Sequence, residues 1–226
     1  MKILFIGNSY TYFNMMPMLF ARLARANGKG VTVDSVTRGG WYLRWFLERN
    51  NEQARQIDWL AKNDHYDVCV LQDQSTAPIT AMETFRDGVT GMVEKLKPCA
   101  DRFFLYETWG RKEGHPTLAE LNLSREAMTD QLAAGYALLG NELGIPIAPV
   151  GRNFQKLNQL RPDLELFDPD LTHPGILGSC LAALTHYYAI FREMPKDMSV
   201  LGLKEDVASI FAQILAENGN QDIEEC

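Results

Sequence analysis

A serine near the start of the chain and an aspartate–histidine pair near its end are the residues whose types and spacing could do chemistry. Ser9 follows an apolar run, 3–6, through the turn Gly7-Asn8. Asp170 and His173 are three residues apart, which on one helical turn places both side chains on one face. A carboxylate on one imidazole nitrogen leaves the other free as a base, and a serine hydroxyl needs such a base to react. The spacing predicts a nucleophile, Ser9, that His173 activates and Asp170 orients.

Acyl transfer through a serine also needs an oxyanion hole, a set of donors that stabilise the developing negative charge. Removing one such donor typically costs about 3–4 kcal/mol of transition-state stabilisation. The candidates are the backbone N–H groups of Ser9 and Gly40 and the side-chain amide of Gln74. Each follows a predicted strand, so all three are expected at one edge of a sheet.

The elements that would position these groups alternate between strands and helices. Apolar runs predict strands at 3–6, 31–36, 67–71, 102–106 and 145–148. Apolar spacing and caps predict helices at 14–27, 43–62, 80–96, 118–143, 151–160, 176–191 and 199–218. A break is expected at Asn50-Asn51, and the apolar pattern of 118–143 is interrupted at Gly135 and Gly140. The alternation predicts an α/β fold, a three-layer α/β/α sandwich with a five-stranded parallel sheet of flavodoxin-like type. Ligands of such sheets bind at the carboxyl ends of the strands.

Composition and charge fit a single domain over 1–226, with a frayed tail at 219–226. The chain is 46% hydrophobic and 23% charged, which is close to the average for globular proteins. Its formal net charge of −7 argues against nucleic acid and anionic membranes as partners, because both require a basic face. There is no apolar run long enough to span a membrane, and Met1 leads directly into the first strand without a secretory signal. The oligomeric state stays open.

Four cysteines are present, and they suggest neither a disulfide framework nor a metal site. They form no CxxC pair and no metal-ligand spacing with histidine: Cys69, Cys99, Cys180 and Cys226. Cys69 and Cys180 fall within apolar elements, where reduced cysteines are common. We therefore expect a cytoplasmic protein, and no cofactor is implied.

Taken in order, these motifs resemble the SGNH/GDSL hydrolase superfamily. The resemblance covers residues 2–191 and rests on Gly7-Asn8-Ser9 after the first strand, glycine after the second, a polar amide after the third, and Asp170-x-x-His173 before the last core helix. It implies Ser9 as the nucleophile, His173 as the general base and Asp170 as its orienting partner. It also implies Gly40 as an oxyanion donor, with Gly39 as its substitute.

One block departs from the superfamily pattern. The superfamily usually has Gly-x-Asn-Asp after the third strand, where this chain has Gln72-Asp73-Gln74-Ser75. Gln74 would supply the same amide on a longer side chain, and Gln72 is the alternative. The chain therefore resembles a divergent bacterial branch. It has no Gly-x-Ser-x-Gly pentapeptide of the kind that α/β-hydrolases carry.

The resulting expectation is a serine esterase acting on a small-molecule ester with an acetyl-type acyl group, with a carbohydrate as one candidate alcohol. Trp109 and Arg111 follow the fourth strand and are candidates for lining the substrate pocket, because an aromatic plane and a guanidinium suit a sugar or an anionic group. Trp41 and Tyr42, beside the glycine block, are candidates for the same reason.

Two other classes stay open. A binding module without turnover would keep the sheet and its crevice, and the missing asparagine block favours it. A metal-dependent hydrolase could use Asp168, Asp170 and His173 as ligands, although no second histidine lies at ligand spacing. The simplest alternative is that Asp168-Pro169-Asp170 is only a turn that caps the next helix.

Overall fold

The computed structural model describes residues 1–48 and 50–224, so the end of the predicted tail, 225–226, lies outside the described residues. Its centre is a five-stranded parallel sheet in the order β2-β1-β3-β4-β5. The strands are β1 (Lys2–Gly7), β2 (Thr32–Thr37), β3 (Tyr66–Leu71), β4 (Ala100–Tyr106) and β5 (Ile147–Ala148). This is the flavodoxin-like strand order, and the predicted fold class is confirmed.

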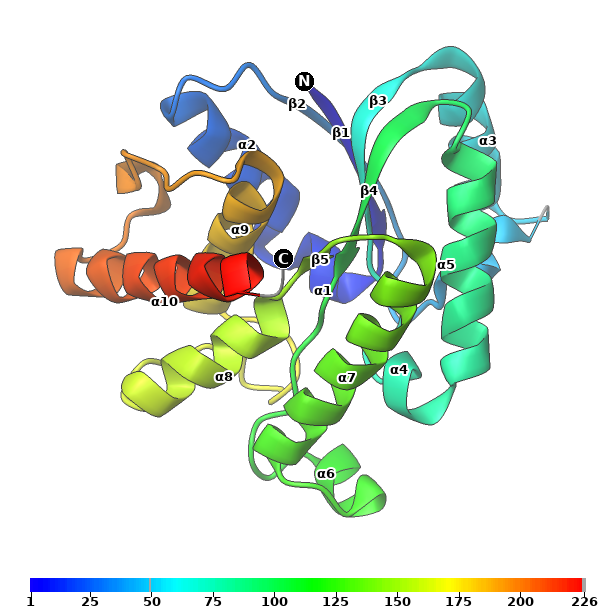
Figure 1. Cartoon of the computed structure of the whole chain (residues 1–226). Coiled ribbons are helices and arrows are strands. Elements are labelled where there is room, and N and C mark those ends of the chain that lie inside the picture. The colour runs from blue at the N-terminus through cyan, green and yellow to red at the C-terminus, as the bar shows by residue number, and fades with distance from the viewer. Residues whose placement is uncertain (49, 225–226) are drawn as a thin grey trace.

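Helices cover both faces of the sheet (Figure 1). One layer contains α2 (Met16–Ala26), α8 (Val150–Leu160), α9 (Ile176–Phe191) and α10 (Glu205–Glu224), and the other contains α3 (Glu52–Asn63), α5 (Met82–Leu96) and α7 (Arg125–Leu143). Successive residues of β1 point into opposite layers: Phe5 packs in the first core and Ile6 in the second. The unbroken apolar run at 3–6 therefore reflects a strand that is buried on both sides.

The segment after Ser9 is not the single helix predicted at 14–27. Asn8 caps a short helix, α1 (Ser9–Tyr12), by accepting the N–H of Tyr10. A 3₁₀ turn, η1 (Phe13–Met15), then leads into α2, with Asn14 at φ 50° and Met15 at φ 53° in the left-handed region. Asn14 therefore lies at a kink between two helices and does not cap one. Ser9 is the first residue of α1.

Other predicted helices are divided as well. The break predicted at Asn50-Asn51 is confirmed, because η2 (Leu43–Leu47) ends before it and Asn51 caps α3. The stretch 118–143 separates into α6 (Pro116–Leu121) and α7 at Asn122, which has φ 54°. Gly135 and Gly140 do not interrupt α7.

Shorter elements complete the chain. They are α4 (Ala77–Thr80), which precedes α5, and η3 (Ser199–Leu201), which precedes α10. The predicted helix at 199–218 is thus divided, and α10 extends to Glu224. Among the described residues, no helix is long and apolar enough to cross a membrane.

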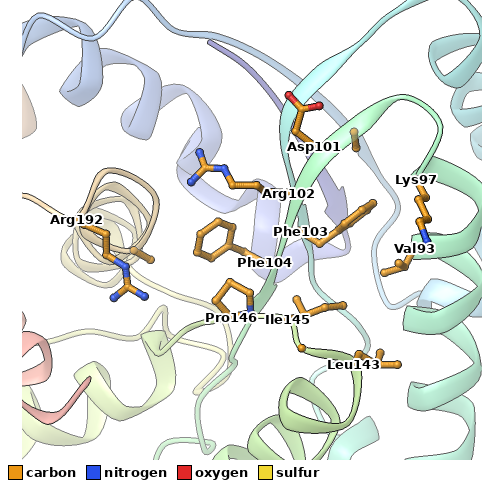
Figure 2. Close-up of a pocket in the computed structure, with 13 residues that line it drawn as sticks. Val93, Lys97, Asp101, Arg102, Phe103, Phe104, Leu143, Ile145, Pro146 and Arg192 are labelled. Carbon is orange, nitrogen blue, oxygen red and sulfur yellow. The ribbon is translucent and has the colours of Figure 1, made fainter. Parts of the chain in front are cut away.

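The outer edge of β4 is only partly covered. β5 pairs with Leu105 and Tyr106 alone, so on this edge no strand of the described residues lies beside the amino-terminal half of β4, which pairs only with β3. A cavity of about 540 Å³ lies there, with Phe103 and Leu143 on one side of the strand and Phe104 on the other (Figure 2). This hollow lies at the opposite end of the sheet from Ser9, so it belongs to a different part of the molecule from the predicted chemistry.

Gly151 at the start of α8 provides a test of the packing between α8 and the end of β4. A β-carbon at this position would collide with the carbonyl oxygen of Thr108. We expect Gly151→Ala to lower the free energy of unfolding by about 1–3 kcal/mol, the usual cost of overpacking, as measured by urea denaturation. Gly30→Ala is the matched control, because a β-carbon there meets nothing within 4 Å. Equal stability of the two variants would contradict the packing described here.

Candidate active site

The three residues predicted to act together lie in one hydrogen-bonded series, which we call the triad. Ser9 starts α1 at the carboxyl end of β1, and its Oγ lies 2.7 Å from Nε2 of His173. The other ring nitrogen, Nδ1, lies 2.5 Å from Oδ2 of Asp170. Since Asp170 engages Nδ1, the imidazole can present Nε2 to the serine hydroxyl as a proton acceptor.

Asp170 and His173 meet through a turn and not through the predicted helical turn. Leu171 has φ 63°, and the backbone N–H groups of Thr172 and His173 donate to Oδ1 of Asp170 at 3.0 and 2.9 Å. Partial burial would raise the pKa of Asp170, but the hydrogen bonds from His173 and these N–H groups hold that pKa below its ordinary value. Asp170 is therefore a charged partner for the imidazole at neutral pH.

Aromatic side chains hold the histidine ring in place. Phe13 stacks on the imidazole with ring centroids 4.1 Å apart and an interplanar angle of 7°. Tyr10 lies on another side at 5.6 Å, and its hydroxyl is 2.8 Å from Oγ1 of Thr172. Asn14 donates from Nδ2 to the carbonyl of Pro174 at 2.8 Å. The segment that follows Ser9 is thus hydrogen-bonded to the residues on both sides of His173, Thr172 and Pro174.

Asn8 ties the loops after β2 and β3 to the nucleophile. Its Nδ2 donates to the carbonyl of Trp41 at 3.1 Å and to that of Asp73 at 3.3 Å. Gly40, with φ 72°, lies in a turn closed by the N–H of Trp41 donating to the carbonyl of Arg38. The Gly40 loop and the Gln74 loop are therefore both attached to the residue that precedes Ser9.

The two glutamines of the divergent block occupy different environments. Gln72 is fully buried, and its Oε1 accepts the N–H of Asn8 at 2.8 Å and the hydroxyl of Thr11 at 2.9 Å, while Nε2 donates to the carbonyl of Asp73. Gln74 is half-buried, and its Oε1 accepts the N–H and hydroxyl of Thr76. With Gln72 fully engaged in the framework, the amide of Gln74 is the better candidate for an oxyanion donor.

Gly40 is likewise better placed than Gly39 to face a ligand. A β-carbon on Gly39 would lie 3.0 Å from the hydroxyl of Tyr12, whereas Gly40 has nothing within 4 Å of that position. The space beside the α-carbon of Gly40 therefore leaves room for a ligand.

Asp73 has a structural part in the site that the sequence did not reveal. Its Oδ1 accepts the N–H of Leu43 at 3.0 Å and that of Gln74 at 2.6 Å. Burial raises the pKa of Asp73 to about 7, against the opposing effect of these two N–H groups. This carboxyl therefore joins the loop after β2 to the loop after β3. Its only signal in the sequence is an acidic residue at the end of an apolar strand.

Trp109 and Arg111, predicted to line the substrate pocket, are both buried, and their part in substrate binding stays a prediction. Trp109 is 1% exposed, stacks between Phe154 and Tyr10, and donates from Nε1 to the carbonyl of Thr172. Arg111 is 7% exposed and donates to Oγ of Ser75, with its guanidinium 5.3 Å from the centroid of the Tyr10 ring. Burial lowers the pKa of Arg111 to about 10. Both side chains support Tyr10, and through it the histidine segment.

The residues considered as metal ligands are engaged within the same turn. The N–H of Asp168 donates to the carbonyl of His173, and both carboxylate oxygens of Asp170 accept hydrogen bonds. Among the side chains that the structure describes, those of residues 1–48 and 50–217, no group of three or more histidines, cysteines, aspartates or glutamates could hold a metal ion.

Known structures resemble the whole backbone. A protein of Slackia heliotrinireducens that is assigned to the SGNH hydrolases is 28% identical, with a TM-score of 0.74 over 84% of this chain and 98% of that chain. The chain has the SGNH hydrolase fold. A DUF4886 family protein from Bacteroides uniformis is similar at 17% identity, with a TM-score of 0.79 over 98% of this chain and 95% of that chain.

A third similar structure is a catalytic mutant of an acetylxylan esterase from Geobacillus stearothermophilus. It is 16% identical, with a TM-score of 0.58 over 90% of this chain and 94% of that chain. No family model matches the sequence, and no curated protein does. The SGNH fold is thus recognised from the backbone and from one relative at 28% identity.

The Asp73 carboxyl provides a test of how the two loops are held. Asp73→Ala leaves the N–H groups of Leu43 and Gln74 without their acceptor, and we expect kcat for ester hydrolysis to fall about tenfold or more, with a smaller change in KM. Asp73→Asn keeps an acceptor oxygen and should retain most of that kcat. Glu107→Ala is the control, because Glu107 is another buried acid that accepts a backbone N–H, from Arg152 in α8. Equal losses in Asp73→Ala and Glu107→Ala would mean that general destabilisation explains both.

The stacked ring of Phe13 provides a second test. Phe13→Ala removes the face on which His173 rests, and an imidazolium gains more from that face than a neutral imidazole does. We expect the kcat of Phe13→Ala to fall about fivefold, because about 1 kcal/mol of stabilisation of the imidazolium is lost. The kcat of Phe13→Leu should fall by the same factor, because leucine has no aromatic face. Steady-state kinetics on one ester substrate would measure both. Full activity in Phe13→Leu would show that packing volume alone suffices.

Proposed function

We propose that the chain is a serine esterase that hydrolyses a small acyl ester, of the acetyl type, through an acyl-enzyme on Ser9. The observation that carries this proposal is the triad itself, with Oγ of Ser9 at 2.7 Å from Nε2 of His173 and Nδ1 at 2.5 Å from Asp170. A nucleophile, its base and an orienting carboxylate in this order are the parts that acyl transfer needs.

In the first half-reaction, Oγ of Ser9 attacks the ester carbonyl carbon while Nε2 of His173 takes the hydroxyl proton. The charged imidazole that forms is stabilised by Asp170 at Nδ1. As the tetrahedral intermediate collapses, the ester C–O bond breaks and the alcohol leaves with the proton from Nε2. The acyl group remains on Ser9 as an ester.

In the second half-reaction, His173 takes a proton from water, and the resulting hydroxide attacks the acyl-enzyme carbonyl. The bond to Oγ breaks, Ser9 regains its proton from Nε2, and the acid is released. Three donors would stabilise the oxyanion in both steps: the N–H of Ser9, in the first turn of α1, the N–H of Gly40, and Nε2 of Gln74. The links from Asn8 and Asp73 to the loops of Gly40 and Gln74 support these assignments.

The acetyl group is proposed for the substrate because the similar Geobacillus structure is that of an acetylxylan esterase. A carbohydrate is the corresponding candidate for the alcohol. The competing function is a binding module without turnover, which the replacement of the family's asparagine by Gln74 favours. A cytoplasmic location stays a prediction from the cysteines and the opening residues.

A labelling experiment separates these functions. Wild type should hydrolyse p-nitrophenyl acetate and take up a fluorophosphonate on Ser9. Ser9→Ala should lose about 1,000-fold or more in kcat, because the nucleophile cannot be replaced, and should not be labelled. His115→Ala is the control, since His115 caps α6 outside the triad. Equal slow rates in wild type and Ser9→Ala, with no label on either protein, would contradict the serine mechanism.

A further inference from the structure

A hollow lined by tryptophans lies on the chain after β2, and its first lining residue directly follows Gly40. Trp41 and Trp45 line it together with Glu48, Asn50 and Asn51, and its volume is about 330 Å³. Trp45 is 39% exposed, although an indole of this size is usually buried or packed against a partner.

The loop that forms the hollow is hydrogen-bonded to the residue that precedes Ser9. Trp41 directly follows Gly40, and its carbonyl accepts Nδ2 of Asn8, the residue before Ser9, at 3.1 Å. Tyr12, which is 41% exposed, lies against the same loop, since a β-carbon on Gly39 would be 3.0 Å from its hydroxyl. A substrate whose acyl group reaches Ser9 can therefore place its alcohol portion over this aromatic loop.

The tryptophan rings are held in fixed positions. Trp45 meets Trp41 edge to face at 6.1 Å and 88°, and meets Tyr42 at 4.9 Å and 68°. Trp41 in turn packs on Phe46, which is fully buried. Asn51 donates from Nδ2 to the carbonyl of Trp45 at 2.7 Å. The surface is preorganised, so a ligand would not have to order it on binding.

The mixture of groups fits a sugar better than a hydrocarbon chain. The C–H face of a pyranose packs on an aromatic ring, and its hydroxyl groups need acceptors and donors at the edge. Glu48 supplies a carboxylate that makes no ion pair with the described residues, and Asn50 supplies a side-chain amide. Glu48 and Asn50 are both exposed at the edge of the hollow, where an acyl chain would form no hydrogen bond with them.

We propose that this hollow is a subsite for a pyranose, namely the sugar that carries the ester, with Trp45 as its stacking surface and Trp41 as its wall. The inference rests on the proposed esterase function and makes it specific. It assigns the alcohol portion of the substrate to the loop after β2, while Ser9 receives the acyl group.

The test compares esters that share an acetyl group and differ in the alcohol. Acetate release is followed from ethyl acetate, from methyl tri-O-acetyl-β-xylopyranoside and from methyl tetra-O-acetyl-β-glucopyranoside. Trp45→Ala should lower kcat/KM for at least one sugar ester about tenfold, mainly through KM, as loss of one stacking contact does. It should leave ethyl acetate within twofold. Trp45→Leu keeps apolar volume without the ring and should behave as Trp45→Ala does.

Trp59→Ala is the matched control, because Trp59 is 60% exposed on α3 and lies outside the hollow. It should leave all three substrates unchanged. The product alcohols, the two methyl glycosides, give a second measurement: at least one should inhibit ethyl acetate hydrolysis by wild type and Trp59→Ala more strongly than by Trp45→Ala.

Three outcomes would overturn the inference. Equal losses on ethyl acetate and on the sugar esters in Trp45→Ala would mean that the loop acts on the oxyanion hole and not on a sugar. Full sugar-ester activity in Trp45→Ala and Trp45→Leu would show that the Trp45 ring is not a stacking surface for the sugar. Ethyl acetate hydrolysis that requires Ser9, without turnover of either sugar ester, would reject the sugar and leave the esterase standing. Hydrolysis that survives Ser9→Ala would instead reject the esterase function itself, and the inference with it.

Discussion

The hydrogen bond from the backbone N–H of Asn8 to Oε1 of Gln72 is the contact on which the geometry of the site depends. It joins the ends of the two central strands at 2.8 Å, and both residues are buried. A buried N–H without an acceptor costs about 1–3 kcal/mol, so the chain is strongly held in this arrangement. A β-carbon on Gly7 would lie 2.6 Å from the same Oε1. The glycine before Asn8 is therefore required by Gln72, and the exit of Ser9 from β1 follows from the pair.

The histidine segment must be brought to Ser9 from more than 160 residues away in the chain. Contacts between these two distant segments accomplish this: Tyr10 with Thr172, Asn14 with Pro174, and Phe13 with the His173 ring. Asn14 adopts left-handed backbone angles to make its contact, a conformation that asparagine tolerates better than most residues. The kink between α1 and α2 is thus explained by the need to reach the histidine segment.

The sequence was sufficient for the strands and the strand order class, because those depend on local apolar runs, and its residue types singled out three side chains that the structure places within hydrogen-bonding distance. It was not sufficient where distant contacts decide. Ser9 begins a helix because Asn8 can cap it, yet Asn14 has the same residue type and does not cap. Trp109 looks like a pocket residue from its place after β4, but Phe154 and Tyr10 bury it from both sides. The contact between Asp170 and His173 was predicted from their spacing, although an Asx-type turn and not a helix provides it.

Two carboxyl groups at the same edge of the sheet have pKa values that move in opposite directions, and this separates their parts in the site. Asp170 is partly exposed and accepts hydrogen bonds from His173 and two N–H groups, which lower its pKa. Asp73 is fully buried, and burial raises its pKa to about 7 in spite of two N–H donors. Only Asp170 is fully charged at neutral pH, so it can stabilise a cation that forms on His173. Asp73 needs only an acceptor oxygen to hold its two loops, and that oxygen is present whether or not the carboxyl carries a proton.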